Sequence, residues 1–239
     1  MSFGEFSTSQ LRPTAHQAAP TVFVIDYDSS VRQSFERVAG HEWHTRFLAS
    51  SEEFFAQPRS LQPGCLLLDL QLPDGGLELQ ARLADRPELP IIFTTAHMNI
   101  PMAVRAMKAG AVDVLSKPFS DDSLSSVIRE SLERSRFHIC QETELRGIRE
   151  RYAALTCRER EVMSLVVSGL LNKQIGARLG ISEITVKAHR GKVMRKMAVD
   201  SLARLVGVAR RLGLTSFPSA SRSLVALEDD FLGWRLLPG

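Results

Sequence analysis

Five polar side chains of complementary chemistry stand directly behind short apolar runs in the first half of the chain. Asp26 and Asp69 follow the runs VFVI and CLLL, and Asp28 comes close behind the first. Thr95 ends IIFTT, and Lys117 follows VDVLS. Neighbouring carboxylates suit a hard cation such as Mg²⁺. A lysine can balance the charge of a phosphorylated carboxylate, and a threonine hydroxyl can hydrogen-bond it. Alternatively, these are only the polar residues that strand ends collect in any such fold.

These residues follow segments that alternate between strand and helix patterns. Strands are predicted at Val22–Asp26, Thr45–Leu48, Cys65–Asp69, Ile91–Thr95 and Val112–Leu115. Helices are predicted at Val31–Ala39, Glu52–Gln57, Leu77–Asp85, Met102–Ala109 and from Asp122 to about Cys140. Continuous apolar strands suit burial on both faces, so we expect an α/β doubly wound, five-stranded parallel sheet. The functional crevice of such a sheet lies beyond the carboxyl ends of its strands, where the polar residues collect.

After Pro118 the pattern is purely helical, which predicts an all-α domain of four helices. Thr156 and Glu159 form a capping box that opens the first of them. The other three are predicted at Asn172–Leu179, from Glu183 to about Met197, and at Ser201–Leu212. Gly180 is expected as a left-handed stop and Ser182 as the next N-cap. Two short helices joined by a glycine-containing turn are typical of a helix-turn-helix.

The third of these helices has the composition of a DNA-reading helix. Its cations are Lys187, Arg190, Lys192, Arg195 and Lys196. Its predicted apolar inner side consists of Ile184, Val186, Val193 and Met197. Thr185, Ala188 and Gly191 are small, which lets the helix sit deep in a major groove about 12 Å wide. The alternative is an amphipathic helix whose basic side is merely solvated.

Composition supports a two-domain protein in which one half meets a polyanion. The 239 residues are 44% apolar and 24% charged. Residues 21–140 have a net charge of −4, whereas residues 151–215 have a net charge of +9. No apolar run approaches the roughly 18 residues needed to span a bilayer. The N-terminal sequence lacks a secretory pattern, and three cysteines are too few for a disulfide framework, so we expect a cytoplasmic protein.

Two stretches resemble a known family. LTCREREVMSLVVSGLLNKQIGARLGISEITVKAHRGKVMRKM resembles the LuxR-type helix-turn-helix of FixJ/NarL response regulators, and PMAVRAMKAGAVDVLSKPF resembles the CheY-like receiver of the FixJ branch. The resemblance implies a regulator of transcription rather than an enzyme. It divides the chain into a disordered tail (1–20), a receiver (21–138), a helical linker (139–150), a DNA-binding domain (151–215) and a C-terminal tail (216–239).

The resemblance also implies roles for single residues. Asp69 is the phospho-acceptor, served by a sensor histidine kinase, with Asp26, Asp28 and Asp69 as the candidate Mg²⁺ ligands. Thr95 is the switch hydroxyl, and Lys117 precedes Pro118 through a bond that is cis in relatives. In a homodimer on promoter half-sites of double-stranded DNA, the base-facing positions are Lys187, Ala188 and Gly191, beside Thr185. The expected phosphate contacts come from Arg190, Lys192, Arg195, Lys196, Asn172, Lys173 and Gln174.

Three departures from the family concern the receiver. Tyr27 replaces the second of two adjacent acids, and a neutral phenol is a poor Mg²⁺ ligand whose ring takes up space. The loop after Asp69 is one residue short, and Val114 stands where relatives carry the switch aromatic. An alternative is therefore an atypical receiver, controlled without phosphorylation by a ligand, a partner or a redox input at Cys157. A flavodoxin-like enzyme is disfavoured, because the acids of DYDSS would repel a phosphate.

The C-terminal tail is too apolar for a free segment. Phe231, Trp234, Leu236 and Leu237 lie within its last residues. We expect the tail to dock on a domain or on a partner.

Overall fold

The computed structural model describes residues 19–38, 42–73, 75–97 and 99–214. The expectations for both tails therefore lie wholly or largely outside the described residues. The chain divides into two compact units, residues 1–142 and 143–239. No helix in the described part of the chain is long and apolar enough to cross a membrane.

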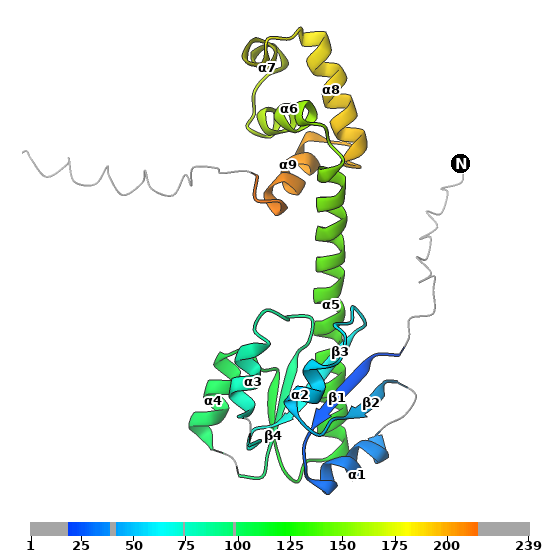
Figure 1. Cartoon of the computed structure of the whole chain (residues 1–239), viewed down its shortest axis with the longest axis vertical. Coiled ribbons are helices and arrows are strands. Elements are labelled where there is room, and N and C mark those ends of the chain that lie inside the picture. The colour runs from blue at the N-terminus through cyan, green and yellow to red at the C-terminus, as the bar shows by residue number, and fades with distance from the viewer. Residues whose placement is uncertain (1–18, 39–41, 74, 98, 215–239) are drawn as a thin grey trace, which may run out of the picture. The chain divides into compact units, whose positions relative to one another are not determined.

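The first unit is the expected parallel sheet (Figure 1). Its strands are β1 (Thr21–Ile25), β2 (His44–Phe47), β3 (Gly64–Asp69), β4 (Ile91–Thr95) and β5 (Asp113–Ser116). They pair in the order β2-β1-β3-β4-β5, and every pair is parallel. This order reverses direction at β1 and β3, so the crevice beyond their carboxyl ends is where such a fold places its functional residues.

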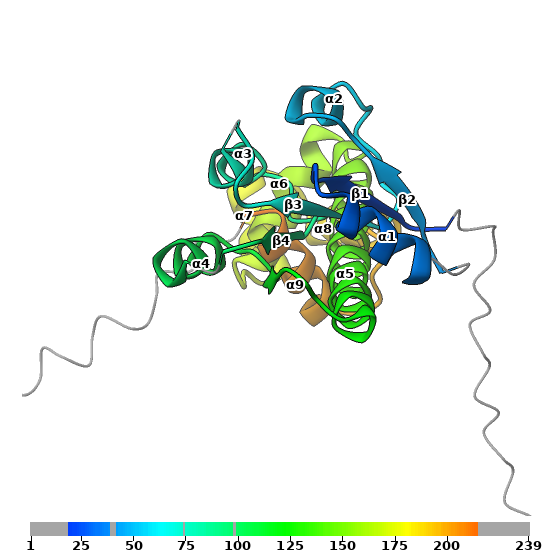
Figure 2. The same ribbon diagram turned by 90° about the horizontal axis from the view of Figure 1, so that it is seen from below.

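Helices cover both faces of the sheet, which explains the uninterrupted apolar strands (Figure 2). On one face, α1 (Ser29–Val38) and α5 (Asp121–Ala153) pack against strand side chains such as Cys65 and Leu67. On the other, α2 (Ser51–Phe55), α3 (Gly76–Arg82) and α4 (Ile100–Lys108) pack against the alternate residues, such as Leu66 and Leu68. Successive strand residues point to opposite faces, so a strand covered twice needs an apolar residue at every position.

The second unit is helical, as predicted. Beyond the end of α5 it contains α6 (Cys157–Val167), α7 (Asn172–Leu179), α8 (Glu183–Lys196) and α9 (Leu202–Arg211). The capping box at Thr156 and Glu159 is complete, and Ser182 caps α8 by accepting a hydrogen bond from the Thr185 amide. Gly180 has a φ of +66°, in the left-handed region that ends α7. A Cβ on Gly176 would lie 2.7 Å from the Ile181 carbonyl oxygen, so α7 can approach the turn only with glycine there.

Candidate functional sites

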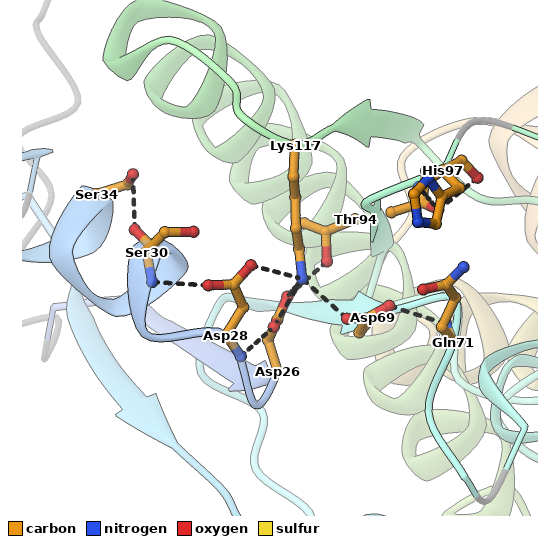
Figure 3. Close-up of polar contacts among 10 residues, drawn as sticks. Asp26, Asp28, Ser30, Ser34, Asp69, Gln71, Thr94, His97 and Lys117 are labelled. Atoms are coloured by element: carbon orange, nitrogen blue, oxygen red, sulfur yellow. Dashed lines mark hydrogen bonds and ion pairs between the residues drawn. The ribbon is translucent and has the colours of Figure 1, made fainter.

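The acidic residues at the carboxyl ends of β1 and β3 converge on one ammonium group (Figure 3). Lys117 Nζ lies 2.8 Å from a carboxylate oxygen of Asp26 and 2.8 Å from one of Asp69, and 3.8 Å from Asp28. The Lys117 side chain is only 7% exposed and that of Asp26 is 0% exposed, whereas Asp69 keeps 17% of its side chain accessible. Lys117 precedes Pro118 through a cis peptide bond, as the resemblance implied. The predicted gathering of charges at this sheet edge is thus present.

Two neutral groups also donate hydrogen bonds to the buried carboxylate of Asp26, and the sequence did not indicate them. The Thr94 hydroxyl donates to Asp26 Oδ2 at 2.7 Å, and the Asp28 amide donates to Asp26 Oδ1 at 2.9 Å. Thr94 is fully buried in β4. A buried carboxylate is tolerated only where donors replace its lost hydration. Thr94 therefore belongs to the site, although only the pairing of β3 with β4 brings it there.

Asp69 is held with one edge toward solvent. Its Oδ2 accepts from Lys117 and its Oδ1 accepts from the Gln71 amide at 2.8 Å. Burial opposes the charge on Lys117, but the hydrogen bonds that its ammonium donates to Asp26 and Asp69 outweigh this effect and raise the Lys117 pKa. The ammonium form is thus secured beside the carboxylate that the resemblance identifies as phospho-acceptor.

Tyr27 does not fill the site. Its side chain is 64% exposed, and its hydroxyl donates to the Ala49 carbonyl at 2.8 Å. The expectation that the Tyr27 ring takes up space in the acidic site is therefore wrong, because this hydrogen bond directs the phenol to the loop after β2. Asp28 lies beside the cluster instead. The Ser30 amide donates to Asp28 Oδ1 and lowers the pKa of that carboxyl.

The two residues that the resemblance assigns to the switch, Thr95 and Val114, contact the loop after β4 and the apolar core. The Thr95 hydroxyl donates to the His97 carbonyl at 3.0 Å and accepts from the His97 amide at 3.3 Å, so it is engaged with the loop after β4. Val114 is half-buried and packs against the core between the sheet and α2, α3 and α4. Position 114 therefore lacks the aromatic ring that the resemblance associates with the switch hydroxyl of Thr95.

The carboxylates suit Mg²⁺ by donor type but not by arrangement. Oxygen ligands are those that Mg²⁺ prefers, and Asp26, Asp28 and Asp69 supply them. In this structure the ammonium of Lys117 lies between two of the three carboxylates. Among the described residues, no group of three or more His, Cys, Asp or Glu side chains is placed to hold a metal ion. As they stand, these residues do not fit the ion.

In the helical unit, α8 presents one side to solvent. Val186, Val193 and Met197 are buried in the core with Ile175 of α7, as predicted for the inner side. The fourth predicted member of that side, Ile184, is 80% exposed, and the prediction for it is wrong. It lies in the first turn of α8, where no preceding helical turn covers it. Lys187, Ala188 and Gly191 are also exposed, one or two turns farther along the same side.

The predicted DNA-contacting cations are not equivalent. Lys192 and Arg195 are exposed, and neither forms an ion pair within the described residues. Lys187 lies 3.5 Å from Glu183 on the surface. Arg190 donates to Asn172 Oδ1 at 2.6 Å and so ties α8 to the start of α7. Lys196 donates to buried Glu159 at 2.7 Å and to the Ala154 carbonyl.

The start of α7 is a candidate for a backbone phosphate. Leu171 is its N-cap and offers no side-chain acceptor to the first amides of the helix. Gln174 Oε1 is used by the Leu171 amide at 2.8 Å, and Lys173 is exposed. Amides at a helix start favour an anion, and a lysine beside them adds to this preference. Thr185 is half-buried, and its hydroxyl lies 2.8 Å from that of Ser182.

A five-stranded parallel domain with an acid–lysine site, followed by a helix-turn-helix unit, defines a two-domain response regulator. Residues 22–129 match the response regulator receiver domain, and residues 153–209 match the bacterial regulatory proteins of the luxR family. The chain belongs to the response regulators that join a receiver to a LuxR-type DNA-binding domain, and it is homologous to the transcriptional regulators FixJ and TodT.

The relatives are similar over most of their lengths. Nodulation protein W of Bradyrhizobium diazoefficiens is 42% identical over 200 residues, which cover 82% of this chain and 87% of that protein. Transcriptional regulatory protein FixJ of Rhizobium meliloti is 40% identical over 196 residues, covering 79% and 94%. The solved structure of response regulator StyR has a TM-score of 0.69 and 41% identity, and covers 81% of this chain and 100% of that one. These matches confirm the expected family, fold class and type of regulator.

Proposed function

We propose that this chain regulates transcription in the cytoplasm without catalysing a reaction, as a homodimer on promoter half-sites, with phosphorylation of Asp69 by a sensor histidine kinase as its input. The observation that supports DNA binding is the exposed basic side of α8. This helix lies in a unit whose residues 151–215 have a net charge of +9. Phosphate neutralisation by such cations supplies most of the affinity of a protein for DNA.

We assign different tasks to the cations of this surface. Lys187 faces base edges beside Ala188 and Gly191, whereas Lys192 and Arg195 contact phosphates. Lys173 and the first amides of α7 bind a phosphate from the other side of the turn. Arg190, Asn172, Gln174 and Lys196 contribute mainly by fixing the helices, since each has a partner inside the unit.

DNA binding is tested by removing two exposed cations from α8. Lys187→Ala/Lys192→Ala should weaken binding of duplex DNA at least about tenfold near 0.15 M salt and reduce the slope of log affinity against log salt by one to two units. Fluorescence anisotropy against salt measures both. Arg204→Ala is the matched control, because it removes an exposed cation from α9. Unchanged affinity in the double variant would contradict the assignment of α8.

We propose that phosphorylation of Asp69 occurs by direct transfer of the phosphoryl group from the kinase. A carboxylate oxygen of Asp69 attacks the phosphorus of a phosphohistidine, the phosphorus–nitrogen bond breaks, and an acyl phosphate forms as the imidazole leaves. Lys117 Nζ, 2.8 Å from Asp69 Oδ2, balances the added negative charge. The accessible edge of Asp69 admits the donor.

A second candidate is a receiver that works without phosphorylation. It is favoured by the exposed phenol at position 27 and by the Lys117 ammonium between Asp26 and Asp69. Incubation with acetyl phosphate, with Mg²⁺ or with a chelator, followed by intact-mass measurement, separates the two candidates. Gain of one phosphoryl group that is lost in Asp69→Asn supports the proposed input. An unchanged mass in every arm, together with unchanged DNA binding of Asp69→Asn, supports the second candidate.

A further inference from the structure

The exposed isoleucine of α8 lies on the side proposed to face DNA. Ile184 is followed by Lys187, Ala188 and Gly191, at three, four and seven residues along the helix, and all four are exposed. Residues with this spacing share one helix face. A single exposed apolar residue is ordinary on a protein surface, so its exposure alone carries no function. The position of Ile184 is more informative. It lies in the first turn of the helix proposed to enter the groove, beside Lys187, which is proposed to face the bases.

Gly191, two turns along the same face, has no role inside the unit. A Cβ at this position would have no atom within 4 Å, and its backbone φ is not in the positive range. A glycine inside a helix costs about 1 kcal/mol relative to alanine, so folding alone would favour alanine here. The missing side chain at Gly191 therefore leaves room on this face for a partner that approaches α8 closely.

The chemistry of Ile184 restricts what it can recognise in DNA. Its side chain has no hydrogen-bonding group, and the apolar group that the major groove presents at base edges is the C5 methyl of thymine. Residues near the start of a recognition helix are those that reach the base edges. We infer that Ile184 contacts a thymine methyl in each half-site and makes the protein prefer thymine there, an inference that rests on the proposed DNA binding.

The test removes the methyl group and the isoleucine separately. The full-length protein first selects its site from duplexes with a random segment of about 20 base pairs, two helical turns. Each thymine of the recovered duplex is then replaced singly by uracil, which deletes one methyl. Wild-type affinity should fall about fourfold at one thymine per half-site, the value of one buried methyl group. In Ile184→Ala, the thymine and uracil duplexes should bind equally at that position.

Two further variants make the outcome specific. Leu202→Ala removes an exposed apolar side chain from α9 and should keep the fourfold thymine preference. Ile184→Val should keep most of it. If no duplex is recovered or bound, the proposed DNA binding is wrong. If a duplex binds but no uracil replacement matters, or if Ile184→Ala keeps the same preference, the inference alone is overturned. Loss of promoter regulation with unchanged DNA binding in Ile184→Ala would likewise overturn it and indicate a protein partner.

Discussion

The two units handle charge in opposite ways. In the receiver, the functional charges lie at one sheet edge and are paired with each other, with Lys117 shared by Asp26, Asp69 and, at 3.8 Å, Asp28. On α8 of the helical unit, Lys192 and Arg195 remain exposed without an ion pair in the described part of the chain. The first arrangement can respond to a phosphoryl group on Asp69, because the added negative charge would compete with Asp26 and Asp28 for the one ammonium of Lys117. The second attracts a polyanion from a distance.

The difference also separates stability from function. Removing a charge from a mutually compensated, buried set leaves its partners without compensation, so the fold itself should suffer. Removing an exposed cation should cost little stability and should change only binding. Three substitutions test how far this distinction holds.

The largest effect is expected at Lys117. Lys117→Met leaves the fully buried Asp26 facing Asp69 without their shared cation, which should lower the free energy of unfolding of the receiver by roughly 3–5 kcal/mol. Urea titration followed by the fluorescence of buried Trp43 measures this, in a Trp234→Phe background that leaves Trp43 as the only tryptophan. Lys108→Met, at an exposed position of α4, is the control. Equal losses of unfolding free energy in the two variants would show that paired, buried charges matter no more for stability than exposed cations.

A second experiment concerns a compensated pair inside the basic unit. The hydrogen bond from Lys196, with that from the Thr156 amide, lowers the Glu159 pKa to about 2 from an ordinary value of 4.5. Because the pKa is lower in the folded state, the stabilisation is complete above pH 4.5 and is lost as the pH falls toward 2. Glu159→Gln should therefore unfold at lower temperature near neutral pH, and its melting temperature should fall less between pH 5 and pH 2 than that of the wild type.

Thermal unfolding followed by circular dichroism measures both effects. Glu161→Gln is the matched control, since Glu161 lies on the same helix but pairs with Arg158 at an exposed position. A wild-type pH profile in Glu159→Gln would show that the pair with Lys196 contributes nothing to folding. Lys196 would then be assigned to phosphate contacts with DNA.

The sequence predicted the arrangements that depend on local patterns. The strands, the capping box at Thr156, the left-handed Gly180 and the cap at Ser182 are all determined by a few neighbouring residues, and all are confirmed. Helical spacing also identified Val186 and Val193 as buried. The same spacing failed at Ile184, because the first turn of a helix is covered only where another element happens to pack on it.

The remaining features depend on contacts between distant segments. Arg190 meets Asn172 across the turn, and Lys196 meets Glu159, so two predicted phosphate-binding cations have partners within the protein. The direction of Tyr27 depends on the Ala49 carbonyl, 22 residues away. Thr94 could not be distinguished within IIFTT, since every residue of that strand is buried. Its position beside Asp26 follows only from the order of strands in the sheet.

The smallest expected effect isolates that threonine. Thr94→Val keeps the shape of the side chain but removes the hydroxyl that donates to Asp26 Oδ2, so the buried carboxylate loses one of its donors. The free energy of unfolding of the receiver should fall by about 1–3 kcal/mol in the same urea titration. Thr45→Val is the matched control, because the Thr45 hydroxyl is buried and has no hydrogen-bond partner within the described residues. Its loss should change stability little or raise it. If the two variants are equally stable, Lys117 and the Asp28 amide alone stabilise the buried Asp26 carboxylate, and the Thr94 hydroxyl of β4 contributes nothing to it.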